Sequence, residues 1–221
     1  MLRPVLCLAL VIAATTTAHA GPWPREAGGV FLSPKLLVTD DWRGAELYGE
    51  YGYSDRLSFG GKLQWRDDDI HTAELFSRWH LHDLGGAHPV SVELGTTARF
   101  SDAIEDRIPR ATGALHFGMG FERPWQGGWL SLSLRGTQPP PSDTLSSVIV
   151  DLDAELGLRP IERAILSMRV EQHFAAGERY ATVVPGAGWE VTGAATLMAQ
   201  GTFDVTGDAE PGLRLALWLE F

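Results

Sequence analysis

The sequence predicts an all-β fold, a single antiparallel β-barrel of about 12 strands. Apolar residues recur at every second position along most of the chain, and no comparable stretch keeps the 3.6-residue period of an amphipathic helix. Clusters of Gly, Pro, Asp and Ser separate these alternating runs. Because successive side chains of a strand point to opposite sides, each run has one apolar face and one mixed face.

The last strand shows the pattern most clearly. From Leu213 to Phe221 every odd position is large and apolar, whereas Arg214 and Glu220 fall on the other face. Turn signals occur at 53–56, 83–86, 126–128 and 159–160. We expect strands at 28–38, 45–54, 56–65, 71–82, 88–100, 110–122, 128–136, 145–157, 161–172, 178–184, 188–203 and 211–221. Twelve is an even number, as single-chain bacterial barrels require.

The first 20 residues predict a cleavable signal peptide. Arg3 precedes an apolar run from Val5 to Ala14, and Ala18-His19-Ala20 fits an A-x-A cleavage site. This apolar run is too short for a membrane-spanning helix, which needs roughly 20 residues. We therefore expect residues 1–20 to be removed during export and residues 21–221 to form one barrel domain.

Composition excludes several functions. The net charge is −10, from 28 acidic and 18 basic residues, and no basic patch indicates nucleic acid as a partner. Cys7 is the only cysteine and lies in the leader, so the mature chain has no thiol chemistry and no disulfide. We expect no cofactor and no bound metal.

Two kinds of barrel fit the alternation. In a soluble, lipocalin-like periplasmic carrier the apolar face points inward, whereas in a membrane barrel it points outward and charged residues surround a wet lumen. Acidic and basic residues on the mixed faces can pair across neighbouring strands, which favours the membrane barrel. These residues are Glu46, Glu50, Lys62, Glu74, Arg78, Glu93, Arg99, Asp151, Asp153, Glu155, Arg163, Arg169, Glu171 and Arg214.

Aromatic residues near strand ends support the same choice. If the first strand rises from the periplasm, Tyr53, Trp79, Phe121 and Phe221 lie at the periplasmic edge of the apolar face, and Trp65 and Phe100 lie at the outer edge. Aromatic girdles flank the lipid-facing band of membrane barrels. The sequence thus predicts a single antiparallel transmembrane β-barrel.

Two segments carry a resemblance to a known class. The segment 213–221, which ends on Phe221, resembles the terminal insertion signal of Gram-negative outer-membrane proteins. The segment 50–57 (Glu-Tyr-Gly-Tyr-Ser-Asp-Arg-Leu) resembles a turn of porin-like barrels, including those associated with phenol-degradation pathways. The resemblance implies outer-membrane localisation and insertion by the barrel-assembly machinery through the Phe221 strand. It implies no particular substrate.

The predicted lumen suggests a function. A 12-stranded barrel lies between eight-stranded barrels filled by side chains and 16-stranded barrels with open channels. We therefore expect a narrow channel for small polar solutes or ions, or a structural barrel whose ion pairs keep it rigid. The candidate constriction comprises the first 12 of the charged residues named above, from Glu46 to Arg169, with an acidic ladder at Asp151, Asp153 and Glu155 facing Arg163 and Arg169.

An outer-membrane lipid-modifying hydrolase is the alternative. Such an enzyme needs a Ser or Thr nucleophile within reach of a His near one membrane edge. His80 and His82 share a face, and His116 lies next to the strand of Ser131 and Ser133. No G-x-S-x-G motif ties them together, so we expect no enzyme activity.

The expected partners are outer-membrane lipid and lipopolysaccharide, and a monomer is expected. Acidic outer loops, with Asp67, Asp68 and Asp69 as the densest run, suggest cations that bridge lipopolysaccharide phosphates. Solvated turns explain the same residues.

Overall fold

The computed structural model describes residues 23–39, 43–67, 71–83, 88–100, 107–139, 148–175, 178–206 and 211–221. The strands are β1 (Val30–Val38), β2 (Arg43–Ser54), β3 (Leu57–Arg66), β4 (His71–Asp83), β5 (Pro89–Phe100), β6 (Arg110–Phe121), β7 (Gly128–Thr137), β8 (Ile149–Ile161), β9 (Ala164–Ala175), β10 (Glu178–Thr192), β11 (Ala195–Asp204) and β12 (Gly212–Glu220). Within these residues no helix is long and apolar enough to cross a membrane.

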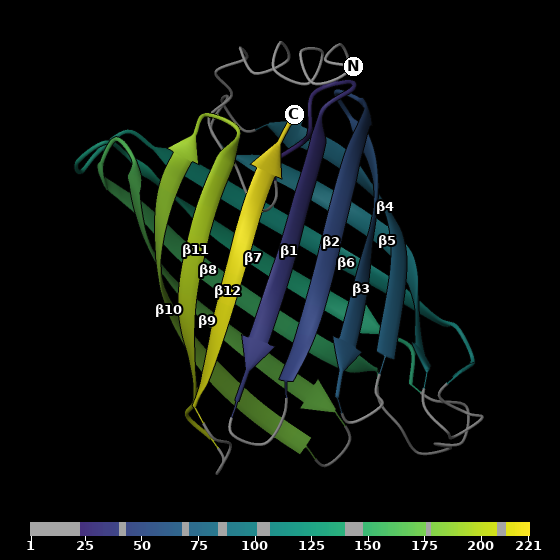
Figure 1. Ribbon diagram of the computed structural model, residues 1–221. Coiled ribbons are helices and arrows are strands. Elements are labelled where there is room, and N and C mark those ends of the chain that lie inside the picture. The colour runs from purple at the N-terminus through teal and green to yellow at the C-terminus, as the bar shows by residue number, and fades with distance from the viewer. Residues whose placement is uncertain are drawn as a thin grey trace, which may run out of the picture.

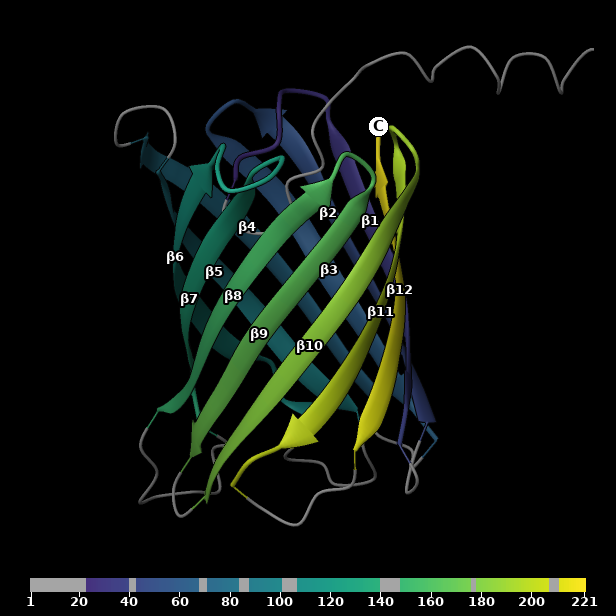
Figure 2. The same cartoon turned by 90° about the vertical axis from the view of Figure 1, so that its left-hand side faces the viewer.

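The strands form one closed antiparallel barrel. Each strand pairs with its neighbours in the sequence, and β1 pairs with β12 to close the sheet. The strands tilt across the barrel wall, as the two views in Figures 1 and 2 show. The predicted fold class and strand number are confirmed.

The two ends of the barrel differ in their connections. At the end where β1 begins and β12 ends, here called the terminal end, connections between strands span two to six residues. At the opposite end, here called the loop end, they span two to eleven residues. Short turns at one end and longer loops at the other are typical of outer-membrane barrels.

The predicted break at 185–187 is wrong. β10 runs without interruption from Glu178 to Thr192, and the turn to β11 lies at 193–194. Pro185 keeps its place opposite Met168 of β9, so the ladder with β9 continues through this position. Only the pairing with β11 is interrupted beside Pro185. A strand tolerates a proline at a position where the backbone pairing with one neighbouring strand is interrupted.

The predicted end of the eighth strand is also wrong. Arg159 and Pro160 belong to β8, which ends at Ile161, after a register shift in its pairing with β9. The turn follows at 162–163, so Arg163 lies exposed in the turn instead of on β9. Arg163 therefore does not face the acidic ladder.

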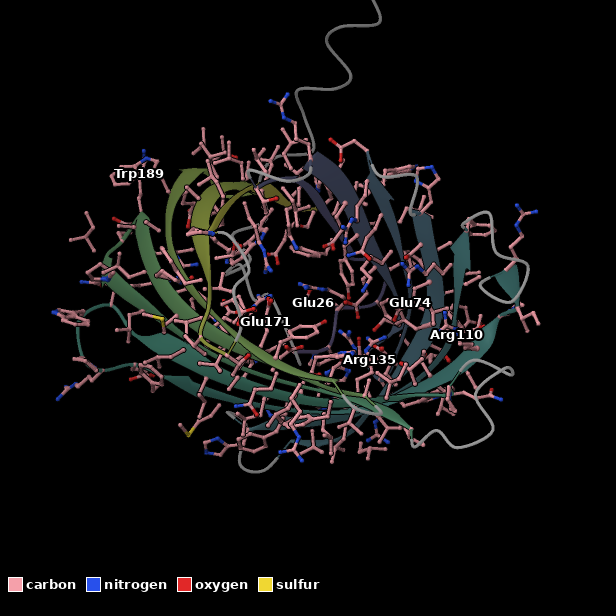
Figure 3. The ribbon with its side chains drawn as sticks, turned by 90° about the horizontal axis from the view of Figure 1, so that it is seen from below. Glu26, Glu74, Arg110, Arg135, Glu171 and Trp189 are labelled. Carbon is pink, nitrogen blue, oxygen red and sulfur yellow. The ribbon has the colours of Figure 1, made fainter. Side chains whose placement is uncertain are left out.

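The apolar face of the strands points outward. Leu75 is 67% exposed and Leu215 is 42% exposed, whereas Glu50 and Glu93 are buried inside the barrel at 3% and 1%. Figure 3 looks along the barrel and shows Trp189 on the outside, while Glu74, Arg135 and Glu171 point inward. Exposed hydrocarbon and enclosed charge are the reverse of a soluble carrier, so the membrane barrel is the arrangement that satisfies both faces.

Large apolar side chains also pack inside the barrel, toward the terminal end. The inner apolar cluster consists of Phe31, Trp129, Ile165, Met198, Ala216 and Trp218. Trp23 and Tyr48 pack against it. Apolar residues on the inward face thus pack together beside the charged lining of the lumen.

A close approach inside the wall requires glycine at position 60. The ring of Phe76 lies over Gly60, where a Cβ atom would meet the ring carbons and would lie 2.7 Å from the carbonyl oxygen of Gly49. The Phe76 ring stacks in turn on Tyr48, with ring centroids 5.8 Å apart. Gly60 thus makes room for an aromatic stack that fills the lumen between β2 and β4.

Candidate functional site in the barrel lumen

Two cavities lie inside the barrel. The inner cavity, of about 300 Å³, reaches Arg25, Phe31 and Trp218 near the terminal end. The outer cavity, of about 510 Å³, reaches Leu37 and Tyr180 nearer the loop end. Charged side chains from many strands line both cavities, so the lumen is polar along much of its length.

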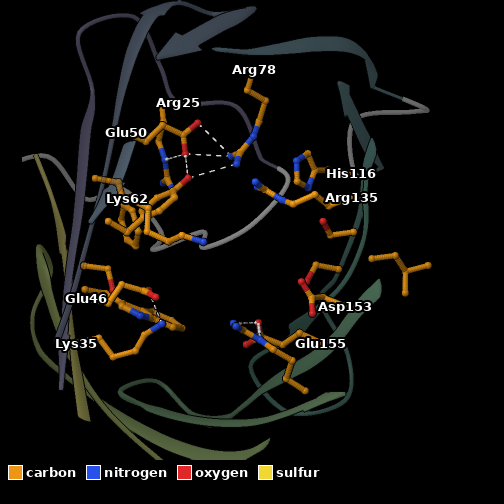
Figure 4. Close-up of a pocket in the computed structure, with 18 of the residues that line it drawn as sticks. Arg25, Lys35, Glu46, Glu50, Lys62, Arg78, His116, Arg135, Asp153 and Glu155 are labelled. Carbon is orange, nitrogen blue, oxygen red and sulfur yellow. Dashed lines mark hydrogen bonds and ion pairs between the residues drawn. The ribbon is translucent and has the colours of Figure 1, made fainter. Parts of the chain in front are cut away.

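The two cavities share part of their lining. Because the same side chains border both spaces, they mark a waist between the cavities. The waist consists of Lys35, Glu46, Lys62, Arg135, Asp153 and Arg169. Figure 4 shows Lys35 and Glu46 projecting from one wall and Asp153 and Glu155 from the wall opposite.

Arg78 is the most heavily bonded cation in the lumen. Its guanidinium donates hydrogen bonds of 3.0 and 3.2 Å to the two carboxylate oxygens of Glu50, and of 2.8 and 3.1 Å to Oε2 of Glu93. It also donates to the Tyr48 hydroxyl oxygen at 3.3 Å, and that hydroxyl donates to Glu50 at 3.0 Å. Full hydrogen bonding compensates the loss of hydration that burial of these charges costs.

Arg135 extends this arrangement across the lumen from β7. It donates to Glu93 at 2.6 Å and to Glu74, which also pairs with Lys62 at 3.1 Å. Residues of β3, β4, β5 and β7 are thereby connected by charge-assisted bonds. These bonds are stronger than neutral hydrogen bonds and fix the orientation of the side chains.

The remaining pairs complete a balanced set. Lys35 lies 2.7 Å from Glu46, Arg169 lies 2.5 Å from Glu155, and Arg214 binds both oxygens of Glu171 at 2.6 and 2.9 Å. We call the whole set the lumenal ion-pair network. Its seven cations are Arg25, Lys35, Lys62, Arg78, Arg135, Arg169 and Arg214, and its seven carboxylates are Glu46, Glu50, Glu74, Glu93, Glu155, Glu171 and Glu220.

Two carboxylates of the cavities lie outside this network. Asp151 accepts a 2.6 Å contact from His173 Nδ1, and the His173 ring stacks on Tyr180 at 4.6 Å. Asp153 has no hydrogen bond or ion pair with any described residue. The acidic ladder of β8 is therefore paired at both ends, by Arg169 and His173, and unpaired in the middle.

The chain segment before β1 lies across the terminal end of the lumen. Arg25 is buried, donates to Glu220 of β12 at 2.9 Å and lies 4.4 Å above the ring of Phe31. Gly28 and Gly29 exchange backbone hydrogen bonds with Gly52 of β2. With Trp23 against the inner apolar cluster, this segment bounds the inner cavity on its terminal side.

The lumenal serines and histidine do not form a catalytic arrangement. His116 is buried, with Nε2 3.4 Å from Glu93, and it lies opposite Ser133 in the β6–β7 pairing. Ser131 and Ser133 line the inner cavity but make no hydrogen bond to His116. His80 and His82 are separated by a register shift against β5. The lumenal position of His116, Ser131 and Ser133 also keeps them from a lipid substrate at the outer surface.

The predicted constriction residues divide into four groups. Lys62, Glu46, Asp153 and Arg169 line the waist, and Glu50, Arg78, Asp151 and Glu155 line one cavity each. Glu74 and Glu93 are buried behind these as partners of Arg135. Arg99 lies on β5 opposite Thr72, away from both cavities, and Arg163 lies in a turn.

Three cations of the network were missing from the 14 charged residues that the sequence placed on the mixed faces. Arg25 precedes the first predicted strand, so the alternation of apolar and polar residues did not assign its side chain to a face of the sheet. Lys35 and Arg135 alternate with apolar neighbours on β1 and β7, and this signal was present in the sequence. The inner apolar cluster was not predicted, because an apolar side chain on the inward face breaks the simple rule of apolar outside and polar inside.

The six predicted interface aromatics lie on the outer face near strand ends. Tyr53 (65% exposed) and Phe221 (64% exposed) lie at the terminal end, with Trp79 and Phe121, and Trp65 and Phe100 lie near the loop end. The sequence missed Trp189, which is 49% exposed near the terminal end of β10, because the strand was predicted to break before it. Of the acidic run Asp67, Asp68 and Asp69, only Asp67 belongs to the described residues.

Several solved structures with a similar fold are outer-membrane porins or channels. The chain is similar to the NanC porin, with a TM-score of 0.67 at 8% identity over 86% of this chain and 98% of that one. The KdgM porin gives 0.66 at 8% identity over 86% and 99%. The fold is that of an outer-membrane porin. The COG4313 outer membrane channel from Pseudomonas putida F1 gives 0.56 at 12% identity over 93% and 99%.

These likenesses concern the fold alone. No protein-family model and no curated protein sequence matches the chain. At such low identity the side chains of the lumen are this protein's own, and its function has to be argued from them.

Proposed function

We propose that this protein is a narrow outer-membrane channel for small polar solutes or ions. The observation that carries the proposal is the pair of adjoining cavities, which share a ring of charged side chains from β1, β2, β3, β7, β8 and β9. A charged lining around enclosed space is the arrangement by which channels replace the hydration of a polar solute. The outward apolar face and the aromatics at strand ends support placement in the outer membrane.

Orientation follows from the two ends. The short turns and the chain termini are assigned to the periplasm and the longer loops to the cell exterior, as in other outer-membrane barrels. A solute from outside would then meet the outer cavity first, pass the waist and reach the inner cavity. The segment around Trp23 and Arg25 would be the last barrier before the periplasm.

The likeness to solved porins supports transport of small solutes. One of the similar solved structures is a complex of the KdgM porin with oligogalacturonate. That ligand belongs to the porin and is not transferred to this chain. Shared architecture at this level supports a solute-conducting barrel and leaves the solute open.

Planar-bilayer recording on refolded protein tests the proposal. We expect small, discrete current steps, and liposome swelling that falls as the solute becomes larger. Heat-modifiable mobility in an SDS gel should first establish that the barrel is folded. A folded barrel that passes neither ions nor small polar solutes would contradict the proposal.

A purely structural barrel is the second candidate, and a specific observation favours it. The inner apolar cluster and the segment before β1 close much of the terminal end, and every network cation is paired. This candidate predicts a heat-stable barrel without conductance. We do not propose a lipid hydrolase, because the lumenal Ser and His residues lie away from the lipid.

Export and assembly complete the proposal. We propose that residues 1–20 are cleaved after Ala20, so that the mature chain begins just before the segment that enters the barrel. Insertion would use the β12 strand with Phe221, and the mature protein would be a monomer. Intact mass and N-terminal sequencing of the membrane fraction test the cleavage, and cross-linking in the membrane tests the monomer.

A further inference from the structure

One carboxylate at the waist of the lumen has no ion-pair partner among the described residues. The lumenal ion-pair network contains seven cations and seven carboxylates, so its charges cancel. Asp151 is held by His173 at 2.6 Å. Asp153 is the remaining carboxylate of the two cavities, and it pairs with no described residue.

The position of this charge matters as much as its presence. Asp153 borders both the inner and the outer cavity, so a solute that moves between them passes its carboxylate. Each of the other five waist residues has an ion-pair partner, on a neighbouring strand or, for Arg135, across the lumen on β4 and β5. Their fields act over short distances, because each cation has a carboxylate within about 3 Å and the two cancel farther away.

The surroundings of Asp153 are unfavourable for a purely structural role. Its direct neighbours in the pairing are Ser133 on β7 and Glu171 on β9, so one of its flanks is another carboxylate. Like charges directly opposite each other destabilise a sheet. A neutral side chain of the same size would fit the site with less repulsion, and an arrangement that departs from the local rule in this way points to function.

We infer that Asp153 is the charge-selectivity residue of this channel and that it favours small cations over anions. The inference rests on the proposed function, since selectivity requires conduction. An unpaired carboxylate at a waist attracts a permeating cation and repels an anion of the same size. The permeant class is therefore small cations.

Reversal potentials in a KCl gradient test this inference, on wild-type protein and on Asp153→Asn. The wild type should favour K⁺ over Cl⁻. Asp153→Asn should lower the cation-to-anion permeability ratio about fivefold, the factor equivalent to ~1 kcal/mol of attraction between unit charges about 4 Å apart in water. Asp153→Lys should reverse the preference. Glu122→Gln removes an equal charge from an exposed turn outside the lumen and is the matched control.

A stability measurement separates selectivity from structure. If Asp153 only repels Glu171, Asp153→Asn should raise the thermal stability of the barrel and leave the permeability ratio unchanged, which would overturn the inference. Currents in the wild type that favour Cl⁻ would overturn it as well. Absence of any current would contradict the proposed channel itself and the inference with it, so the two failures are distinguishable.

Discussion

Replacement of Arg78 by methionine tests whether the lumenal ion pairs hold the barrel together. Methionine keeps the length and most of the volume of the arginine side chain but removes its five hydrogen bonds to Tyr48, Glu50 and Glu93. Both carboxylates are almost completely buried, at 1% side-chain exposure. The substitution therefore leaves two buried charges without their shared partner.

The expected loss follows from what remains around the two carboxylates. Removal of one member of a buried ion pair costs about 3–5 kcal/mol, mostly because a buried charge stays uncompensated. Glu93 retains Arg135 at 2.6 Å, and Glu50 retains Ser58 at 2.7 Å with Arg25 farther away at 3.8 Å. Because these second partners remain, the expected loss in the free energy of unfolding lies near the lower end of this range, at about 3 kcal/mol.

Urea unfolding of the refolded barrel in detergent or lipid, followed by tryptophan fluorescence, measures this loss. Arg56→Met, in the exposed turn between β2 and β3, should change stability by less than about 0.5 kcal/mol. Addition of Glu93→Gln to Arg78→Met should recover part of the loss, because it removes one of the two stranded charges. A variant with Arg78→Met that unfolds within about 1 kcal/mol of the wild type would refute the view that the network stabilises the barrel.

Three further changes test other parts of the structure. Gly60→Ala forces a Cβ atom against the ring of Phe76 and should lower the free energy of unfolding by about 1–3 kcal/mol. Gly120→Ala should be tolerated, because nothing lies within 4 Å of the added Cβ atom. The urea midpoints of the two variants measure the difference. Leu75→Arg on the apolar outer face should lower the free energy of unfolding in lipid by about 2–4 kcal/mol. The control, Ile108→Arg, lies outside the strands and should lower it little. Equal losses for the two variants would contradict the assignment of the outer face to lipid. Arg25→Ala loosens the segment at the terminal end and should raise single-channel conductance, and an unchanged conductance would show that this segment does not limit flow.

The outer face of this fold was predictable, because every second residue of each strand in a membrane barrel contacts lipid and is therefore apolar. The alternation from Leu213 to Phe221 and its repetition along the chain therefore gave the strand number and the apolar face. Strand ends were predicted less well. The Pro185-Gly186 pair has the composition of a turn, and only the intact ladder with β9 shows that the strand continues.

The partners inside the lumen could not be predicted from alternation. A period of two assigns a side chain to a face but does not say which neighbour it meets across the barrel. Arg25 binds Glu220 across 195 positions of sequence, and Arg135 binds Glu74 across 61. These pairs depend on closure of the barrel and on the stagger between strands, which are properties of the whole sheet.

The balance of charge in the lumen connects stability with the proposed transport. A network with equal numbers of cations and carboxylates can be buried at modest cost, because each charge replaces its water with a partner. For the same reason it presents little net field to a passing ion, and its removal should affect folding more than selectivity. A single unpaired carboxylate has the opposite properties, since it adds nothing to the pairing and leaves its field in the lumen. Variants of Arg78 should therefore change the stability of the barrel in unfolding experiments. Variants of Asp153 should instead change the reversal potential.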